Sequence, residues 1–227
     1  MEKLVYALGL REGVTAPALA AKLQQAGARH IRTNLRDAAV TAGAQLVQSR
    51  GERLPDCVVQ FWLPSANPAF RSAIDRVLAG ASTAMRGWLV SEATIIANQA
   101  HPAQSGKRTP GFAQLAFLTL RDGMAWYDWR ATWRDFHTRV AIETQSNFEY
   151  VQNLVVEPLT DTGGEIIAIV EECFPEAALT DPLAFFDAVG DPRKFKANLD
   201  RMMESCARFI TPGTIDVFPT SQYDFAD

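Results

Sequence analysis

The chain repeats one pattern in its two halves, and this repeat limits the possible folds most strongly. Three segments of the first half recur in the second half, in the same order and at nearly equal spacing: LVYALGLREG (4–13) with QLAFLTLRDG (114–123), VVQFWLP (58–64) with IVEECFP (169–175), and WLVSEATI (88–95) with RFITPGTI (208–215). The offset grows from 110 to 120 residues along the chain. We therefore infer a duplication, with an insertion between Pro175 and the helix after Gly190.

Each copy reads as a strand, a helix, two strands, a helix and a strand. In the first copy the predicted strands are 4–10, 44–49, 57–63 and 89–96, and the predicted helices are 16–32 and 70–85. In the second copy the predicted strands are 115–120, 150–156, 165–174 and 214–218, and the predicted helices are 125–142 and 192–207. This βαββαβ order is that of the ferredoxin-like unit.

The domain organisation follows from the repeat. Residues 1–98 form the first predicted unit, 99–111 a linker rich in Pro, Gly and polar residues, and 112–227 the second unit. A four-stranded sheet with both helices on one face leaves its other face uncovered. The predicted fold class is therefore α+β, with the two tandem units covering each other, face to face or as one intrachain barrel.

Composition and charge narrow the classes of partner. Of 227 residues, 48% are hydrophobic and 21% charged, which is typical of a globular core. The formal charge of −4, without a run of Lys or Arg, argues against a nucleic-acid or membrane-surface partner. The chain shows neither a signal-peptide pattern nor an apolar run of roughly 18–20 residues, so we expect a cytoplasmic protein. Cys57, Cys173 and Cys206 lack metal-ligand spacing, and we expect reduced thiols and no metal site.

The segment WYDWRATWRDFH (126–137) holds three of the five tryptophans and one of the three histidines. At 100° per residue, one predicted helix face holds four aromatic residues and a histidine: Trp126, Trp129, Trp133, Phe136 and His137. One interpretation is a core in which the imidazole bonds a backbone carbonyl. The other is a pocket with an indole wall and a histidine that titrates near neutral pH.

The repeat offers an internal comparison for this histidine. His137 aligns with Gly27, and Glu171 aligns with Gln60, so the first copy lacks both ionisable groups. A one-turn slip of the alignment would instead bring His30 into register. We predict a functional site in the second unit and a scaffold role for the first.

Three segments of the second unit resemble the EthD-like family of dimeric α/β-barrel proteins: WRATWRDFHTRV, YVQNLVV and GGEIIAIVEECF. The resemblance covers about residues 114–218, and its motifs are loose. Cys173 stands where the family commonly has an aromatic residue, and the first unit lacks the family's histidine. The resemblance implies a tandem, single-chain version of the dimeric α/β barrel. It also implies a hydrophobic, often aromatic or polyketide-like, small-molecule substrate.

The resemblance also implies site residues. His137 matches the family's helix histidine, Glu171 sits at its acidic position, and Tyr150 and Asn153 fall in its strand motif. We expect His137 and Glu171 to be catalytic, and Trp129 and Trp133, from their place on the helix face, to form the substrate-binding wall with Tyr150 and Asn153. Strand alternation places Tyr150 and Asn153 on opposite faces, and likewise Glu171 and Glu172. Which face meets His137 stays open at this point.

The leading functional hypothesis is a cofactor-independent enzyme of dehydratase, isomerase or cyclase type, with His137 as general acid or base. Three alternatives stay open: a non-catalytic protein that binds a hydrophobic metabolite, a haem protein with His137 as ligand, and a cofactor-free monooxygenase that uses O₂. A homodimer of the tandem chain is also left open.

Overall fold

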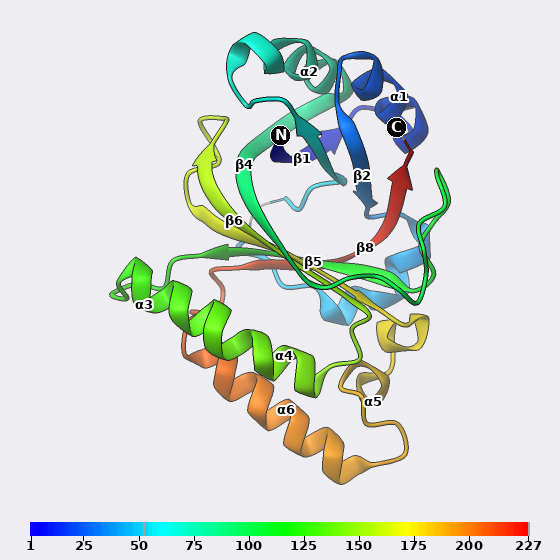
Figure 1. The fold of residues 1–227 in the computed structure, drawn as a ribbon. Helices are drawn as coiled ribbons and strands as arrows, with labels where there is room; N and C mark the ends of the chain where they lie inside the picture. Colours follow the sequence, from blue (N-terminus) through cyan, green and yellow to red (C-terminus); the bar gives the residue numbers. More distant parts are fainter. Residues whose placement is uncertain (52, 227) are drawn as a thin grey trace.

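The computed structural model describes residues 1–51 and 53–226. Within these residues, eight antiparallel strands close into one barrel in the order β1-β3-β2-β8-β5-β7-β6-β4 (Figure 1). The strands are β1 (Glu2–Leu10), β2 (Arg29–Leu35), β3 (Cys57–Leu63), β4 (Ser82–Ile96), β5 (Phe112–Thr119), β6 (Glu149–Pro158), β7 (Ile166–Phe174) and β8 (Asp216–Phe225). The predicted α+β class and the barrel are confirmed.

Helices cover the barrel on two opposite sides (Figure 1). On one side lie α1 (Ala16–Gln25) and α2 (Pro68–Ala81). On the other side lie α3 (Trp126–Ala131), a π-helical turn η2 (Thr132–His137), α4 (Thr138–Thr144), α5 (Pro182–Phe185) and α6 (Pro192–Ala207). The described residues also form two 3₁₀ segments, η1 (Ala38–Leu46) and η3 (Glu176–Leu179). The segment between Pro175 and Gly190, where the sequence analysis expects an insertion, contains η3 and α5.

The strand order has the same form in both halves. Strands β1 to β4 lie in the order β4-β1-β3-β2, and strands β5 to β8 lie in the order β8-β5-β7-β6. The pairs β2–β8 and β4–β6 join the two sheets into the barrel. Residues 99–111, the predicted linker, lie between β4 and β5.

Strand alternation divides the core into layers. On β1, Leu4, Tyr6 and Leu8 pack outward in one cluster with residues of α1 and α2. Val5 and Ala7 point into the lumen and pack with residues of the second half, such as Phe117 and Phe218 of β5 and β8. A third cluster lies between β5 to β8 and the helices of the second half.

Helix α6 occupies the predicted range because its start signal is strong. The carboxylate of Asp191 accepts hydrogen bonds from the backbone N–H groups of Arg193 and Lys194 at 3.1 and 3.0 Å, and Pro192 follows at the first helical position. The same combination of cap and proline opens α1 at Thr15 and α2 at Asn67.

The predicted second strand of the first half is wrong. Helix α1 ends at Gln25, because Gly27 takes a left-handed φ of +102°, and the strand that follows is residues 29–35. The segment predicted as strand 44–49 lies in and just after the 3₁₀ segment η1, and only Gln48 pairs, with Val217. Helix α2 is also shorter than predicted, because β4 begins at Ser82.

The described helices include none with the length and apolar character needed to cross a bilayer. All three cysteines are free thiols; Cys57 and Cys173 are buried and Cys206 is half-buried.

Candidate functional site

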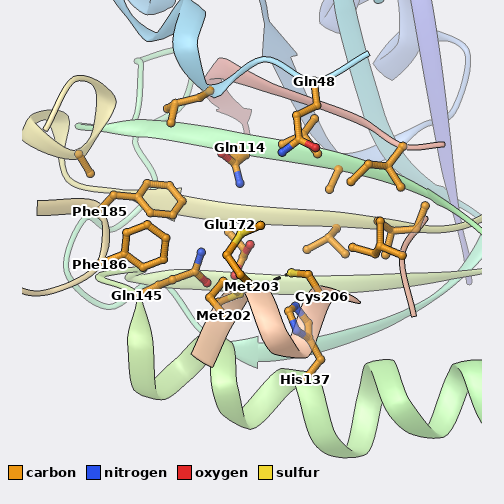
Figure 2. Close-up of a pocket in the computed structure, with 18 of the residues that line it drawn as sticks. Gln48, Gln114, His137, Gln145, Glu172, Phe185, Phe186, Met202, Met203 and Cys206 are labelled. Carbon is orange, nitrogen blue, oxygen red and sulfur yellow. Dashed lines mark hydrogen bonds between the residues drawn. The ribbon is translucent and has the colours of Figure 1, made fainter. Parts of the chain in front are cut away.

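A cavity of about 350 Å³ lies between the outer face of β5 to β8 and the helices of the second half. Figure 2 shows Gln114 and Glu172 extending from the strands and His137 extending from the helix on the other side of the same space. Apolar side chains make most of the wall, including Trp133, Val170, Phe185, Phe186, Met202 and Phe209. The 3₁₀ segment η1 of the first half adds Gln45, Leu46 and, just beyond it, Gln48.

The π-helical turn decides which aromatic side chains face the sheet. Trp129 and Trp133 are fully buried, and Trp129 Nε1 donates to the carbonyl oxygen of Phe209 at 3.0 Å. Trp126 and Phe136, predicted on the same face, are instead 37% and 41% exposed. For Phe136 the prediction fails because the wider turn at 132–137 changes the angular spacing from that of a regular α-helix. Trp126 lies before this turn, as the first residue of α3. Only Trp133 of the two buried indoles lines the cavity.

His137 is partly buried and lines the cavity as predicted. Its Nδ1 lies 2.8 Å from Ser205 Oγ, and its ring centroid lies 4.8 Å from that of Phe209. Burial lowers the pKa of the imidazole from 6.5 to about 4. His137 is therefore neutral at neutral pH and a weak base.

Three polar side chains form a row across neighbouring strands on the cavity wall. Glu172 of β7 is paired in register with Gln114 of β5 and with Tyr150 of β6, and all three line the cavity. The open question of strand face is thereby answered: Tyr150 and Glu172 share the cavity with His137.

Glu172 has the environment of an acid or base. Its carboxyl group is buried in a largely apolar wall and accepts one hydrogen bond, from Asn147 Nδ2 at 2.8 Å. Burial raises the pKa of Glu172 to about 7, and the bond from Asn147 opposes this rise. Near pH 7 Glu172 can therefore both release and accept a proton.

Glu171 points the other way, into the barrel lumen. It accepts hydrogen bonds from Asn34, Gln60 and Gln222 and lies 3.2 Å from the Arg32 guanidinium. Burial alone would raise the pKa of Glu171, but Arg32 and these donors lower it to about 2. Glu171 therefore does not share a cavity with His137, and the partner of the imidazole is Ser205.

Asn153 also faces the lumen, where its amide nitrogen and oxygen are buried without a hydrogen-bond partner. The predicted residues thus separate into two places. His137, Trp133 and Tyr150 meet at the outer cavity, whereas Glu171 and Asn153 lie inside the barrel.

The equivalent outer face of the first half is closed by packed side chains. Leu23, which aligns with Trp133, is fully buried in one cluster with Leu4 and Leu78. Tyr6 is also buried there, and its hydroxyl donates to Asp75 at 2.9 Å.

Several cavity residues escaped the sequence analysis: Gln45, Gln48, Gln114, Gln145, Met202 and Cys206. Gln145 ends α4, and its buried Oε1 has no partner. Gln114 could have been found from its pairing with the Glu172 strand. The others come from segments that are far apart in the sequence and have no shared motif.

No family model matches the chain, and no curated protein matches it. Solved structures do overlay nearly all of it. An anthrone oxidase-like protein matches with TM-score 0.51 and 10% identity, over 100% of this chain and 94% of that one. A structure named as a monooxygenase of Lactobacillus acidophilus NCFM gives 0.49 and 9%, over 99% and 95%. A structure named as a chlorite dismutase gives 0.43 and 10%, over 97% and 95%.

These structures all have the dimeric α/β-barrel, ferredoxin-like fold. At 9–10% sequence identity, the likeness between these structures and this chain concerns the fold alone. The comparisons do not show the EthD-like family itself.

The predicted dehydratase, isomerase or cyclase function is corrected by this finding. The anthrone oxidase-like protein, which matches with TM-score 0.51, is named for oxidation instead. The pKa of about 4 for His137 also removes the near-neutral base on which that prediction depended.

Haem, one of the alternatives that the sequence leaves open, does not fit the cavity. Haem carries two propionates, and buried carboxylates need cationic or hydrogen-bonding partners. Among the described residues the cavity wall contains no Lys or Arg, and it contributes a carboxyl group of its own, Glu172. We derive no chemistry through haem.

Proposed function

We propose that the outer cavity oxidises an apolar aromatic molecule with O₂, without a cofactor, and that Glu172 is the catalytic base. The observation that carries the proposal is a carboxyl group with a pKa near 7 in a mostly apolar cavity of about 350 Å³. The fold likeness to an anthrone oxidase-like protein suggests the substrate class, a tricyclic ketone with an acidic CH₂ group.

The reaction balances without a further reductant. Glu172 takes a proton from the acidic CH₂, and the negative charge spreads onto the ring system and its oxygen. The carbanion transfers electrons to O₂, a C–O bond forms, and the peroxide oxygen takes up the proton. Loss of water from the hydroperoxide leaves a carbonyl, so that CH₂ and O₂ become C=O and H₂O.

Tyr150 would stabilise the developing negative charge. Burial and the nearby Glu172 raise the pKa of its phenol, so that it keeps its proton. Its oxygen accepts a bond from Gln152 Nε2 at 2.8 Å, which orients the hydroxyl. A neutral donor beside an apolar wall is suited to an oxyanion. Gln114, on the other side of Glu172, offers an amide to a substrate oxygen.

His137 would act as a neutral polar group rather than as the base. Its bond with Ser205 fixes the ring against Phe209. Trp133, Phe185 and Phe186 supply flat apolar surfaces for a ring system.

The proposal includes the tandem organisation. Residues 1–98 and 112–227 would be two copies of one unit joined by 99–111, with the reaction in the second copy. The identical strand order of the halves supports this interpretation. We also propose that residues 114–218 are related to the EthD-like family that they resemble.

Oxygen uptake tests the function. The purified chain is mixed with anthrone in an oxygen-electrode cell, and anthraquinone is followed by absorbance. We expect uptake of one O₂ per anthrone and a large loss in Glu172→Gln, with Glu176→Gln as the matched control on an exposed carboxylate. Saturable binding of anthrone without oxygen uptake would contradict the proposal.

A further inference from the structure

The barrel lumen contains a second cavity, of about 360 Å³, at its polar end. Lumen-facing side chains of β1, β2, β3, β4, β6 and β8 line it, together with the chain after β4. The wall includes Lys3, Arg32, Gln60, Trp62, Glu92 and Glu149. The barrel wall separates it from the outer cavity, since on β7 Glu171 faces the lumen and Glu172 faces outward.

The charges around this cavity do not balance. Lys3 Nζ pairs with Glu92 at 2.5 Å. Arg32 pairs with three carboxylates, at 2.7 Å from Glu149, 3.2 Å from Glu171 and 2.7 Å from Asp224. Glu149 also accepts hydrogen bonds from Asn98 Nδ2 at 3.4 Å and Gln222 Nε2 at 3.2 Å. Four carboxylates therefore surround one lysine and one arginine in this cluster of described residues. Such a cluster repels anions and attracts cations.

Gln60 provides an independent sign of a missing partner. Its side chain is 2% exposed, and its Nε2 donates to Asn34 at 3.0 Å and to Glu171 at 2.8 Å. Gln60 is one of the residues that line the cavity, and its buried Oε1 has no hydrogen-bond partner. A buried acceptor left unpaired costs free energy, which a ligand N–H group would offset.

The size and the wall of the cavity favour an organic cation over a bare metal ion. A volume of about 360 Å³ far exceeds the roughly 10–15 Å³ that a single water-sized sphere needs. Trp62 offers an indole face, which attracts cations, and Val151, Ala97 and Ala103 offer contacts for carbon.

We propose that the lumen cavity binds a small organic ammonium ion. Its N–H groups donate to Gln60 Oε1 and to the carboxylates of Glu149 and Glu92, and its apolar part lies along Trp62. The site is independent of the oxidation proposed for the outer cavity, because the two cavities share no lining residue.

Calorimetric titration with benzylammonium chloride tests the proposal, with benzyl alcohol as the neutral ligand of matched shape. We expect benzylammonium to bind at one site per chain and to raise the Tm. Benzyl alcohol should bind at least about tenfold more weakly. Glu149→Gln should weaken benzylammonium binding at least about tenfold, because it removes one negative charge but leaves Arg32 paired with Glu171 and Asp224.

Two variants locate the site. Glu165→Gln changes an exposed carboxylate elsewhere, and Glu172→Gln changes the outer cavity; both should bind benzylammonium as the unaltered chain does. Where Glu149→Gln does not fold, Asp224→Asn replaces it, with the same expected loss. The proposal is overturned by equal binding of benzyl alcohol, by stabilisation with KCl alone, by unchanged affinity in the lumen variant, or by lost affinity in Glu172→Gln.

Discussion

Tyr150 and Glu172 lie directly opposite each other on β6 and β7, and both side chains face the outer cavity. The pairing sets a phenol that keeps its proton beside a carboxyl group that titrates near pH 7. Neighbouring strands thus place a phenol and a titratable carboxyl group on one wall, fixed by the sheet rather than by a loop.

The pH dependence of oxidation should follow Glu172. The carboxylate form is the active base, so the rate should rise with pH and level off above about 7, the pKa of the group. Glu172→Gln should lower the turnover of anthrone by roughly 10²–10⁴-fold and abolish that rise. Initial rates of oxygen uptake between pH 5 and 9 measure both effects; an unchanged profile in the variant would remove Glu172 from the reaction.

Glu171→Gln should act on stability and leave the pH profile of oxidation as it is. The carboxylate accepts hydrogen bonds from Asn34, Gln60 and Gln222, and the amide replacement leaves part of these buried donors unpaired, at a cost of about 1–3 kcal/mol in the free energy of unfolding. Denaturant titration measures the loss. A shift of the rate profile in this variant would show that the two neighbouring glutamates are not functionally separated.

His137 should make the fold sensitive to acid. Its folded pKa of about 4 lies below the value of 6.5 for a free imidazole, so the unfolded chain binds more protons between these values. The stabilisation is complete above pH 6.5 and is lost as the pH falls toward 4. Urea midpoints at pH 7 and pH 4.5 should therefore differ more in the unaltered chain than in His137→Gln; equal differences would contradict the assignment.

The two tryptophans Trp129 and Trp126 form a matched pair for stability. Trp129→Phe removes the indole N–H that donates a hydrogen bond to the Phe209 carbonyl oxygen. The loss should cost about 1–3 kcal/mol in the free energy of unfolding. Trp126→Phe changes a side chain that is 37% exposed and should cost at most about 0.5 kcal/mol. Thermal or urea unfolding of both variants checks this, and similar losses in the two would refute it.

The sequence predicts the barrel well because the repeat and the helix start signals are local features. Asp191 with Pro192, for example, marks the start of α6 at the residue where it begins. The strand 29–35 was missed because its alternating pattern runs straight on from α1, and only the left-handed Gly27 separates them.

The candidate site was predicted only in part, for two physical reasons. The alternation of side chains along a strand places Glu171 and Glu172 on opposite faces, but it does not determine which of the two faces the helices. That choice depends on how the barrel closes. The fixed 100° spacing overlooks the π-helical turn, which contains the exposed Phe136, and Trp126 is exposed at the first residue of α3. Ser205, the partner of His137, lies 68 residues away along the chain.

Closure of the barrel has a consequence for the separate halves. Strands β2 and β4 of the first half pair with β8 and β6 of the second, and so satisfy the backbone hydrogen-bonding groups along their edges. A fragment of residues 112–226 alone would carry two rows of unsatisfied peptide groups, one along each side of its sheet. Such a fragment would self-associate, with two copies rebuilding the ring that the intact chain completes within a single molecule.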